Sequence, residues 1–300
     1  MMPVSPCRLC GAMKELQESH ILPGFVFRWK KETSATGYLR FGQQPNLRVQ
    51  DGVKLHLLCR DCEQRFNNWE TEFANRIFHP MTQGKAARAC YGPWLLLFCA
   101  SVSWRVWCIT YHIDGNHLTH MVKALLPSVK RAELAWREFL LGNRARPQPH
   151  EQHIWPLAGG LLESYTHSKM PANINRYLFR TTDMSVASNE RDAFTYAKLG
   201  PFLMLGFIAM PRPKQWVGTR VNTHGGTIGP REYTMPKEFW EYISGQADRA
   251  ATLQERISER QTAKIAETYR ANLDRAAQSD FMRVMDQDVK LFGRRAFRKK

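Results

Sequence analysis

The sequence predicts an α+β protein, and three features lead to that class. Two Cys-x-x-Cys pairs near the N-terminus precede a segment with helical periodicity. The middle of the chain contains short aromatic and β-branched runs bounded by Gly and Pro, which is typical of strands. From about residue 246 to 289 the chain is rich in Ala, Arg, Glu and Gln and lacks Gly and Pro, which predicts a long helix.

These features predict three consecutive regions. A cysteine-bearing module is expected over 1–84, a mixed α/β region over 85–244, and a long basic C-terminal helix with its tail over 245–300. The 300 residues are enough for a sizeable core, and hydrophobic residues at 43% with aromatics at 11% exclude a disordered chain.

In the first region a helix is expected to begin near Cys62 and to stop at Pro80. Its apolar residues recur at steps of three and four and form one face: Phe66, Trp69, Phe73 and Ile77. Three polar residues fall together on another face: Glu63, Asn67 and Glu70.

In the middle region residues 117–141 read as one or two helices broken near Pro127, and a loop rich in Gly, Asn and Pro follows. Three runs then predict strands: 176–182, 194–200 and 202–210. No motif in this region predicts a role for it.

The most apolar stretch, residues 94–113, is long enough to span a bilayer. Arg105 lies just past its middle with Ser101 and Ser103 beside it, and a charge at that depth is costly in lipid. A buried helix or helix–strand pair is therefore expected, with no membrane contact. The N-terminus lacks a signal-peptide run and the seven cysteines form no regular framework, which favours a cytoplasmic location.

The charge balance favours an anionic partner. Lys and Arg number 43 against 27 Asp and Glu, which gives a formal net charge of +16. The excess is spread along the chain, so it is not confined to one tail. A nucleic acid is the polyanion that this balance favours.

The two Cys-x-x-Cys pairs predict a metal centre. Cys7 with Cys10 and Cys59 with Cys62 supply the four thiolates of a tetrahedral structural Zn²⁺, although the gap between the pairs is long for a compact zinc ribbon. Unliganded or redox-active thiols are the alternative. The other three cysteines lie in or beside apolar sequence and are expected to be buried small hydrophobes: Cys90, Cys99 and Cys108.

The order "CRLC", "SHILP" and "KLHLLCRDCE" resembles the zinc-containing HNH endonucleases of the ββα-metal, treble-clef type. That family commonly reads Cys-x-x-Cys, then Asp-His-Ile-x-Pro, then Asn-Leu-Gln-x-Leu-Cys-x-x-Cys-His. The likeness covers about residues 7–80. It implies a zinc-stabilised ββα module in which His20 is the general base that takes a proton from the water attacking a phosphodiester.

Three other positions depart from the family pattern. Ser19 stands at the metal-binding Asp, Lys54 at the Asn that orients the catalytic histidine, and Glu63 at the last His or Asn, which binds the catalytic metal. In one interpretation Glu63 holds Mg²⁺ or Mn²⁺, with Asn67 and Glu70 on the same helix face. Lys54 would then contact a phosphate oxygen or offset charge in the transition state.

In the opposite interpretation the metal site has decayed, His20 packs beside the zinc module and Lys54 is an ordinary surface charge. Asn46 is a further candidate for the missing Asn, although an insertion would be needed, and His56 shares a strand face with Lys54. Residues 28–31, "RWKK", either grip a nucleic-acid backbone with Trp29 stacked on a base, or form a solvated charge run.

The first functional hypothesis is a divergent HNH-type metal-dependent nuclease that hydrolyses phosphodiester bonds, with DNA favoured over RNA and phage defence as its setting. The alternative is a catalytically inactive zinc-containing protein that binds nucleic acid or acts as a scaffold. The C-terminal helix is a candidate surface for a protein partner or for self-association, because its charges alternate along an interrupted apolar stripe.

Overall fold

The computed structural model describes residues 3–113, 125–157 and 170–297. The protein is mixed α+β, as the sequence predicts, and its chain forms two compact units. Unit 1 contains Met1–Pro23, Val53–Gly159 and Thr182–Thr234, and unit 2 contains Gly24–Gly52, Gly160–Thr181 and Met235–Lys300. Each unit is assembled from segments distant in the sequence, and the three consecutive domains expected above stay a prediction.

Unit 1 begins with a three-stranded antiparallel sheet of order β1-β2-β5. Its strands are β1 (Val4–Pro6), β2 (Met13–His20) and β5 (Lys54–Cys59). Residues 24–52 belong to unit 2, and the chain returns where the Ile21 amide donates to the Val53 carbonyl at 3.1 Å. The gap between the two cysteine pairs is long because residues 24–52 belong to unit 2, whereas the flanking strands β2 and β5 pair with each other in unit 1.

The helix after β5 is longer than the sequence predicts. It runs as α2 (Arg60–Phe73), the π-helical turn η1 (Ala74–Phe78) and α3 (His79–Thr82). Pro80 does not end it, because in the π-helical turn the His79 amide reaches back five residues to the Ala74 carbonyl and Pro80 starts the next turn. Three of the four residues of the predicted apolar face are buried: Phe66, Phe73 and Ile77 are at most 1% exposed, whereas Trp69 is half-buried.

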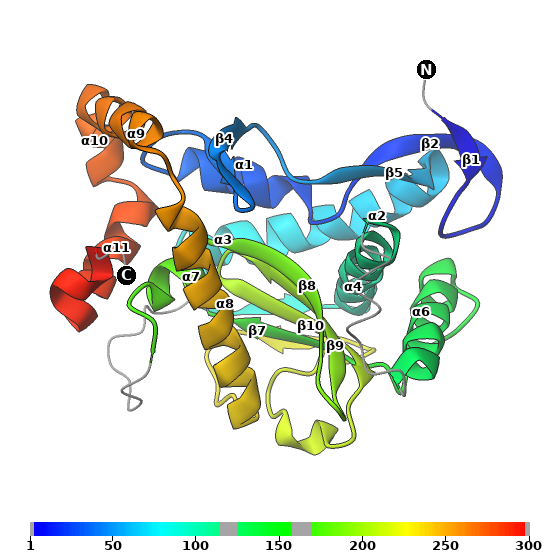
Figure 1. Ribbon diagram of the computed structural model, residues 1–300. Helices are drawn as coiled ribbons and strands as arrows, with labels where there is room; N and C mark the ends of the chain where they lie inside the picture. Colours follow the sequence, from blue (N-terminus) through cyan, green and yellow to red (C-terminus); the bar gives the residue numbers. More distant parts are fainter. Residues whose placement is uncertain (1–2, 114–124, 158–169, 298–300) are drawn as a thin grey trace. The chain divides into compact units, whose positions relative to one another are not determined.

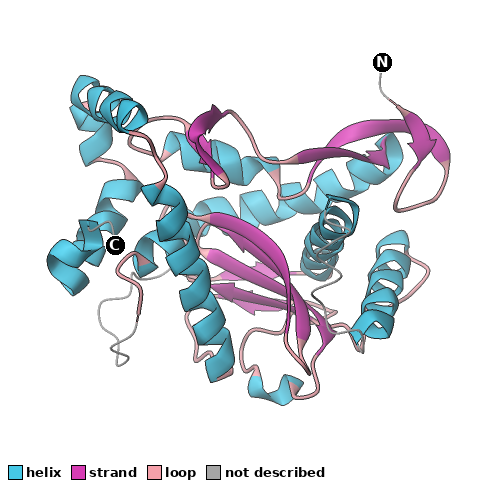
Figure 2. Cartoon of the chain, in the orientation of Figure 1, coloured by secondary structure: helices cyan, strands magenta, loops and turns pink. Residues whose placement is uncertain are grey.

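The main sheet of unit 1 has the strand order β7-β10-β9-β8 and is antiparallel throughout. Figure 2 shows these strands side by side. They are β7 (Gln152–Pro156), β8 (Thr182–Ser188), β9 (Ala193–Leu199) and β10 (Phe202–Ala209). The predictions for 194–200 and 202–210 are confirmed.

Two helices of unit 1 pack on this sheet. α4 (Trp94–Ile113) contacts all four strands, and α6 (Leu126–Leu141) contacts α4 and β10. α6 begins next to Pro127 and ends at Gly142, whose φ of 86° is the left-handed conformation that glycine adopts readily. The predicted helical residues 117–124 lie outside the described residues. Within the described residues, no helix is long and apolar enough to cross a membrane.

A small antiparallel pair completes the strands of unit 1. It joins β6 (Ala89–Tyr91) to β11 (Gly226–Ile228), and the short 3-10 helix η3 spans Pro213–Gln215.

Unit 2 contains the helix α1 (Gly24–Glu32) and an antiparallel hairpin of β3 (Leu39–Phe41) and β4 (Gln44–Val49). Its remaining elements are α7 (Ile174–Arg180), α8 (Lys237–Glu255), α9 (Glu259–Ala271), α10 (Leu273–Ala277), α11 (Asp280–Phe292) and the 3-10 helix η4 (Gly293–Phe297), which Figure 1 labels where there is room.

The C-terminal part is helical, as predicted, and contains the long helix α8, but the helical run is interrupted. Ser258 and Ser279 are N-caps: their hydroxyls accept hydrogen bonds from the amides of Gln261 at 3.4 Å and Met282 at 3.3 Å. A serine at this position starts a new helix instead of continuing the preceding one. The apolar stripe is also incomplete, since Leu273 is 66% exposed.

The strand predicted over 176–182 is wrong for most of its length, because α7 occupies it through Arg180. The amides of Asn175 and Arg176 donate to the two carboxylate oxygens of Asp288 on α11, at 2.9 and 3.2 Å. The guanidinium of Arg176 also binds Asp288 at 2.8 Å, and Asp288 is fully buried. A carboxylate at the first amides of a helix satisfies donors that the helix leaves free, so a distant residue overrides the local strand propensity.

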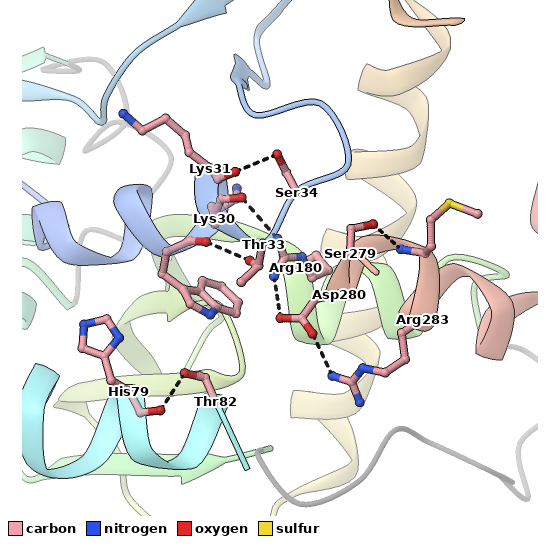
Figure 3. Close-up of polar contacts among 12 residues, drawn as sticks. Lys30, Lys31, Thr33, Ser34, His79, Thr82, Arg180, Ser279, Asp280 and Arg283 are labelled. Atoms are coloured by element: carbon pink, nitrogen blue, oxygen red, sulfur yellow. Dashed lines mark hydrogen bonds and ion pairs between the residues drawn. The ribbon is translucent and has the colours of Figure 1, made fainter. Parts of the chain in front are cut away.

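A second cluster of polar contacts in unit 2 is centred on Arg180 (Figure 3). Its guanidinium lies 4.5 Å from the ring centre of Trp29, donates to the Lys30 carbonyl at 3.3 Å and faces the Asp280 carboxylate at 3.5 Å. Burial lowers the pKa of Arg180 to about 10. Trp29 is only 5% exposed and its ring contacts Arg180, which argues against the alternative in which Trp29 stacks on a nucleic-acid base.

Candidate metal centre and catalytic site

The four predicted zinc ligands converge in unit 1. The sulfur atoms of Cys7, Cys10, Cys59 and Cys62 all lie within 4.8 Å of one another. Four thiolates at about 2.3 Å from a tetrahedral zinc are about 3.8 Å apart. The Cys10 and Cys59 sulfurs are 3.9 Å apart, which matches that edge length. The cysteines are therefore placed to bind a metal ion, consistent with structural Zn²⁺.

Local backbone geometry places each pair. Between β1 and β2 the Cys7 amide donates to the Ala12 carbonyl at 2.9 Å, and the Gly11 amide returns to the Cys7 carbonyl at 2.8 Å. Gly11 has a φ of 78°, so this tight turn needs a residue that tolerates the left-handed region. The second pair joins the last residue of β5 to the first turn of α2, where free helix amides favour a thiolate.

Hydrogen bonds among the thiols perturb their acidity. The contact with Cys62 is the main cause that holds the pKa of Cys7 at about 4, and the same contact raises the pKa of Cys62. Burial raises the pKa of Cys10. A bound dication would favour the ionised form of the thiols.

Two arginines fasten the cysteine cluster to α6. Arg137 Nε donates to the carbonyl of Leu9, between Cys7 and Cys10, at 2.7 Å. Arg65 on α2 donates to the Leu140 carbonyl at 3.0 Å. Each half of the cluster is thus tied to the same helix, which limits its movement.

The remaining cysteines meet the prediction in two cases of three. Cys99 is fully buried and Cys108 is 6% exposed, and burial raises the pKa of both thiols. The prediction of a buried Cys90 is wrong, because this residue is exposed in β6, which pairs with only one short strand.

The other end of the β2–β5 ladder carries the candidate catalytic residues. His20, the last residue of β2, is half-buried and lies directly opposite Lys54. Residues directly opposite in an antiparallel pair present their side chains on the same face. Lys54 Nζ lies 3.8 Å from a carboxylate oxygen of Glu18, and His56, opposite Glu18, is exposed.

Ser19 and Glu63 are in direct contact. The fully buried hydroxyl of Ser19 donates to Glu63 Oε2 at 2.5 Å, and Glu63 lies in the first turn of α2. These are the two positions that the family resemblance assigns to the catalytic metal. Because Ser19 and His20 are consecutive strand residues, strand alternation sends their side chains to opposite faces.

Arg105, the charge inside the apolar stretch 94–113, fastens this end of the ladder. Its guanidinium is 2% exposed, donates to the His20 carbonyl at 2.8 Å and pairs with Glu70 of α2 at 2.6 Å. It also contacts the Ser101 carbonyl at 3.3 Å and the Phe66 ring at 5.3 Å. The charge is paired, which makes its burial tolerable.

Glu70, which was expected on the same helix face as Glu63, binds Arg105 through Oε1. Asn67 is exposed on the same helix. Among the described residues, the four cysteines are the only group of three or more His, Cys, Asp or Glu close enough to hold an ion. The sequence shows Arg105 as a charge inside an apolar stretch. Its partners Glu70 and the His20 carbonyl come from segments far away in the chain.

Asn46, the alternative for the missing asparagine, has another role. In unit 2 its amide nitrogen donates to the Arg256 carbonyl at 3.1 Å, and its amide oxygen accepts from the Ser258 amide at 2.8 Å. The side chain therefore fastens the β3–β4 hairpin to the turn between α8 and α9.

A second polar cluster in unit 1 has the residue types of a hydrolytic triad. His153 lies 2.8 Å from the Thr219 hydroxyl and 3.4 Å from Glu151. His153 is 1% and Thr219 2% exposed, and the imidazole stacks on Phe207 at 4.0 Å. Burial lowers the pKa of His153. A substrate cannot reach this buried hydroxyl, so the cluster is part of the core.

Comparisons with protein-family models, curated proteins and solved structures found no match.

Proposed function

We propose that the protein is a divergent HNH-type nuclease that hydrolyses phosphodiester bonds in DNA. The observation that carries this proposal is the 2.5 Å contact between Glu63 and Ser19, the residue that precedes His20 in β2. Two positions that the family uses for one metal ion come together across β2 and α2, although the residues at both positions are different. Two antiparallel strands followed by a helix, with a four-cysteine cluster at one end, also support it.

The proposed roles follow from the donor chemistry. Glu63 offers a carboxylate oxygen and Ser19 a hydroxyl oxygen, and Mg²⁺ or Mn²⁺ commonly binds one or two carboxylates and retains several waters. A bound ion would supply positive charge to the phosphate and to a water molecule. His20 would accept the proton of that water, and Lys54, opposite His20, would bind a phosphate oxygen.

The setting is also part of this proposal. The net charge of +16 supports binding to a polyanion, and DNA is favoured over RNA through the family resemblance alone. From the same resemblance we propose a role in phage defence, and the irregular spacing of the seven cysteines favours the cytoplasm.

A second candidate function is a catalytically inactive zinc-containing protein that binds nucleic acid or serves as a scaffold. One observation favours it: Ser19 contacts Glu63, whereas strand alternation directs the adjacent His20 to the other face. In this case the hydrogen bond between Ser19 and Glu63 stabilises the fold and holds no metal ion.

Cleavage assays separate the two candidates. Wild-type protein, His20→Ala and Glu63→Gln would be incubated with plasmid and with single-stranded DNA, with and without Mg²⁺ or Mn²⁺. His56→Ala is the matched control, since His56 is an exposed histidine on the opposing strand. The nuclease proposal expects a loss of about 100-fold or more in the first two variants, unchanged zinc content and a normal control.

Equal cleavage by His20→Ala and wild type would remove His20 from the mechanism. Salt-sensitive binding without cleavage would support the second candidate as a binding protein, and no binding at low salt would leave the scaffold role.

A further inference from the structure

The β3–β4 hairpin of unit 2 concentrates positive charge. Arg40 and Arg48 are directly opposite each other in the two strands. Both guanidinium groups lie over the ring of Tyr38, at 5.4 and 3.9 Å from its centre. Like charges directly opposite in an antiparallel pair are destabilising, so this arrangement costs stability unless an anion offsets it.

The described residues place no carboxylate within 4.0 Å of Arg40 or Arg48. Arg40 donates instead to two neutral oxygens, the Pro45 carbonyl at 2.8 Å and Gln261 Oε1 at 3.1 Å. These bonds hold the Arg40 guanidinium in place, and together with the Tyr38 ring they leave it without a negatively charged partner. Arg48 is exposed to solvent.

An open pocket of about 520 Å³ lies on the same hairpin. It is lined by Gln43, Gln44, Pro45, Asn46, Leu47 and Arg256. Asn46 and Arg256 both line the pocket, and the two hydrogen bonds of Asn46 to the backbone at Arg256 and Ser258 fix their relative position without a ligand. Leu47 is 51% exposed, so its apolar side chain is accessible at the pocket wall.

We propose that this hairpin binds single-stranded nucleic acid, with one base held in the pocket against Leu47 and the backbone phosphates at Arg48 and Arg256. An apolar side chain, primary amides and arginines together suit a base and its phosphates. The volume lies within the range of about 300–1,000 Å³ common for ligand pockets. A duplex presents its bases only as edges in grooves, whereas a single strand can place a whole base in the pocket.

This binding surface is formed by unit 2 alone and does not rest on the chemistry of His20. It goes beyond the proposed nuclease function, because it predicts the strandedness of the nucleic acid and residues that no HNH motif contains. The full chain would bind a single strand through this surface whether or not it cleaves one.

Fluorescence anisotropy tests the proposal with a labelled 20-nucleotide oligothymidine, and with a mixed-sequence oligonucleotide alone and annealed to its complement. No Mg²⁺ or Mn²⁺ is added. The test variant is Arg48→Gln/Arg256→Gln. The matched control is Arg249→Gln/Arg270→Gln, which removes the same charge from exposed positions of unit 2 outside the hairpin. Circular dichroism checks that both variants are folded.

We expect the test variant to weaken single-strand binding about tenfold or more and to reduce the salt slope by about 1.4, since two phosphate contacts are lost. The control should change the Kd less than about twofold. Leu47→Ala, at an exposed position, should weaken binding about fivefold without changing the salt slope.

Three results would overturn the proposal. They are equal losses in the test and control variants, tighter binding of the duplex than of the single strand, and no binding of any oligonucleotide at low salt. Loss of cleavage in His20→Ala with unchanged binding would leave the hairpin proposal intact, so the two proposals fail separately.

Discussion

The two ends of the β2–β5 ladder are stabilised in different ways. At one end β5 finishes at Cys59, and four sulfur atoms converge within 4.8 Å. At the other end His20 and Lys54 are paired across the strands, and the polar groups around them engage protein partners such as Arg105 and Glu18. The cysteine end is arranged to bind a metal ion. At the histidine end, by contrast, the polar groups already bind other residues of the protein.

This difference shows why the cysteine cluster was easier to predict than the candidate catalytic site. Tetrahedral thiolate coordination requires particular residues at particular spacings, and those spacings are visible in one dimension. A catalytic constellation can be rebuilt from different residues, so its completeness depends on where side chains meet in space. Four measurements test the contrast, starting with the largest expected effect.

Removing one thiolate should affect the cysteine end most. Cys59→Ser is expected to lose bound zinc and about 5 kcal/mol or more of unfolding free energy, because metal binding and folding are linked. Metal content by mass spectrometry and urea denaturation would measure both. Cys90→Ser is the control, since Cys90 is exposed and outside the cluster. Full zinc content in Cys59→Ser would refute the assigned ligand.

Breaking the buried ion pair should come next. Arg105→Met leaves the carboxylate of Glu70 without its partner and the His20 carbonyl without its donor, at an expected cost of about 3 kcal/mol. Removing both charges in Arg105→Met/Glu70→Met should cost less than the single change. Urea denaturation of the two single variants and the double variant measures their unfolding free energies. If the double variant is as unstable as the sum of both single variants, the pair does not couple the two residues.

Replacing Ser19 with the aspartate of the HNH pattern that this sequence resembles would sharpen the contrast, because two neighbouring carboxylates could bind a metal ion together. Ser19→Asp places a second carboxylate beside Glu63, and the repulsion should cost about 1–3 kcal/mol without metal. Added Mn²⁺ should restore the stability in proportion to its binding, whereas wild type should respond less. Thermal unfolding with and without Mn²⁺ measures this. An equal response of both proteins to Mn²⁺ would count against a metal position here.

The smallest effect is expected for the exposed pair near the cysteine end. Lys14 Nζ lies 2.6 Å from Asp61 Oδ2, and this contact raises the pKa of Lys14 and lowers that of Asp61. Both side chains are solvated and screened by salt, so Lys14→Ala should leave the urea midpoint unchanged within error. A clear loss of stability would mean that the exposed and buried pairs contribute alike.

The secondary structure was predictable where local pattern and tertiary packing agree. The spacing of Phe66, Phe73 and Ile77 predicted the buried face of α2 and η1, and the aromatic runs predicted β9 and β10. It was not predictable at α7, where Asp288 from the far end of the chain binds the first helix amides. Pro80 is a similar case, since the preceding π-helical turn lets the helix continue.

By itself, the sequence determined the chemistry that depends on residue type and close spacing. The two Cys-x-x-Cys pairs, the position of His20 in "SHILP", the charged interruption at Arg105 and the excess of basic residues can all be read from the chain without a structure. Such features are local or compositional, so they do not require the path of the backbone to be known.

Only the tertiary structure decided which of those residues meet. It brought Ser19 to Glu63, paired Arg105 with Glu70 and the His20 carbonyl, and used Asn46 to shape a pocket on a hairpin. These contacts join segments far apart in the sequence, and side-chain hydrogen bonds depend on distances of a few tenths of an ångström. No spacing rule contains that information, because residues 24–52, which separate β2 from β5 in the sequence, belong to the other unit.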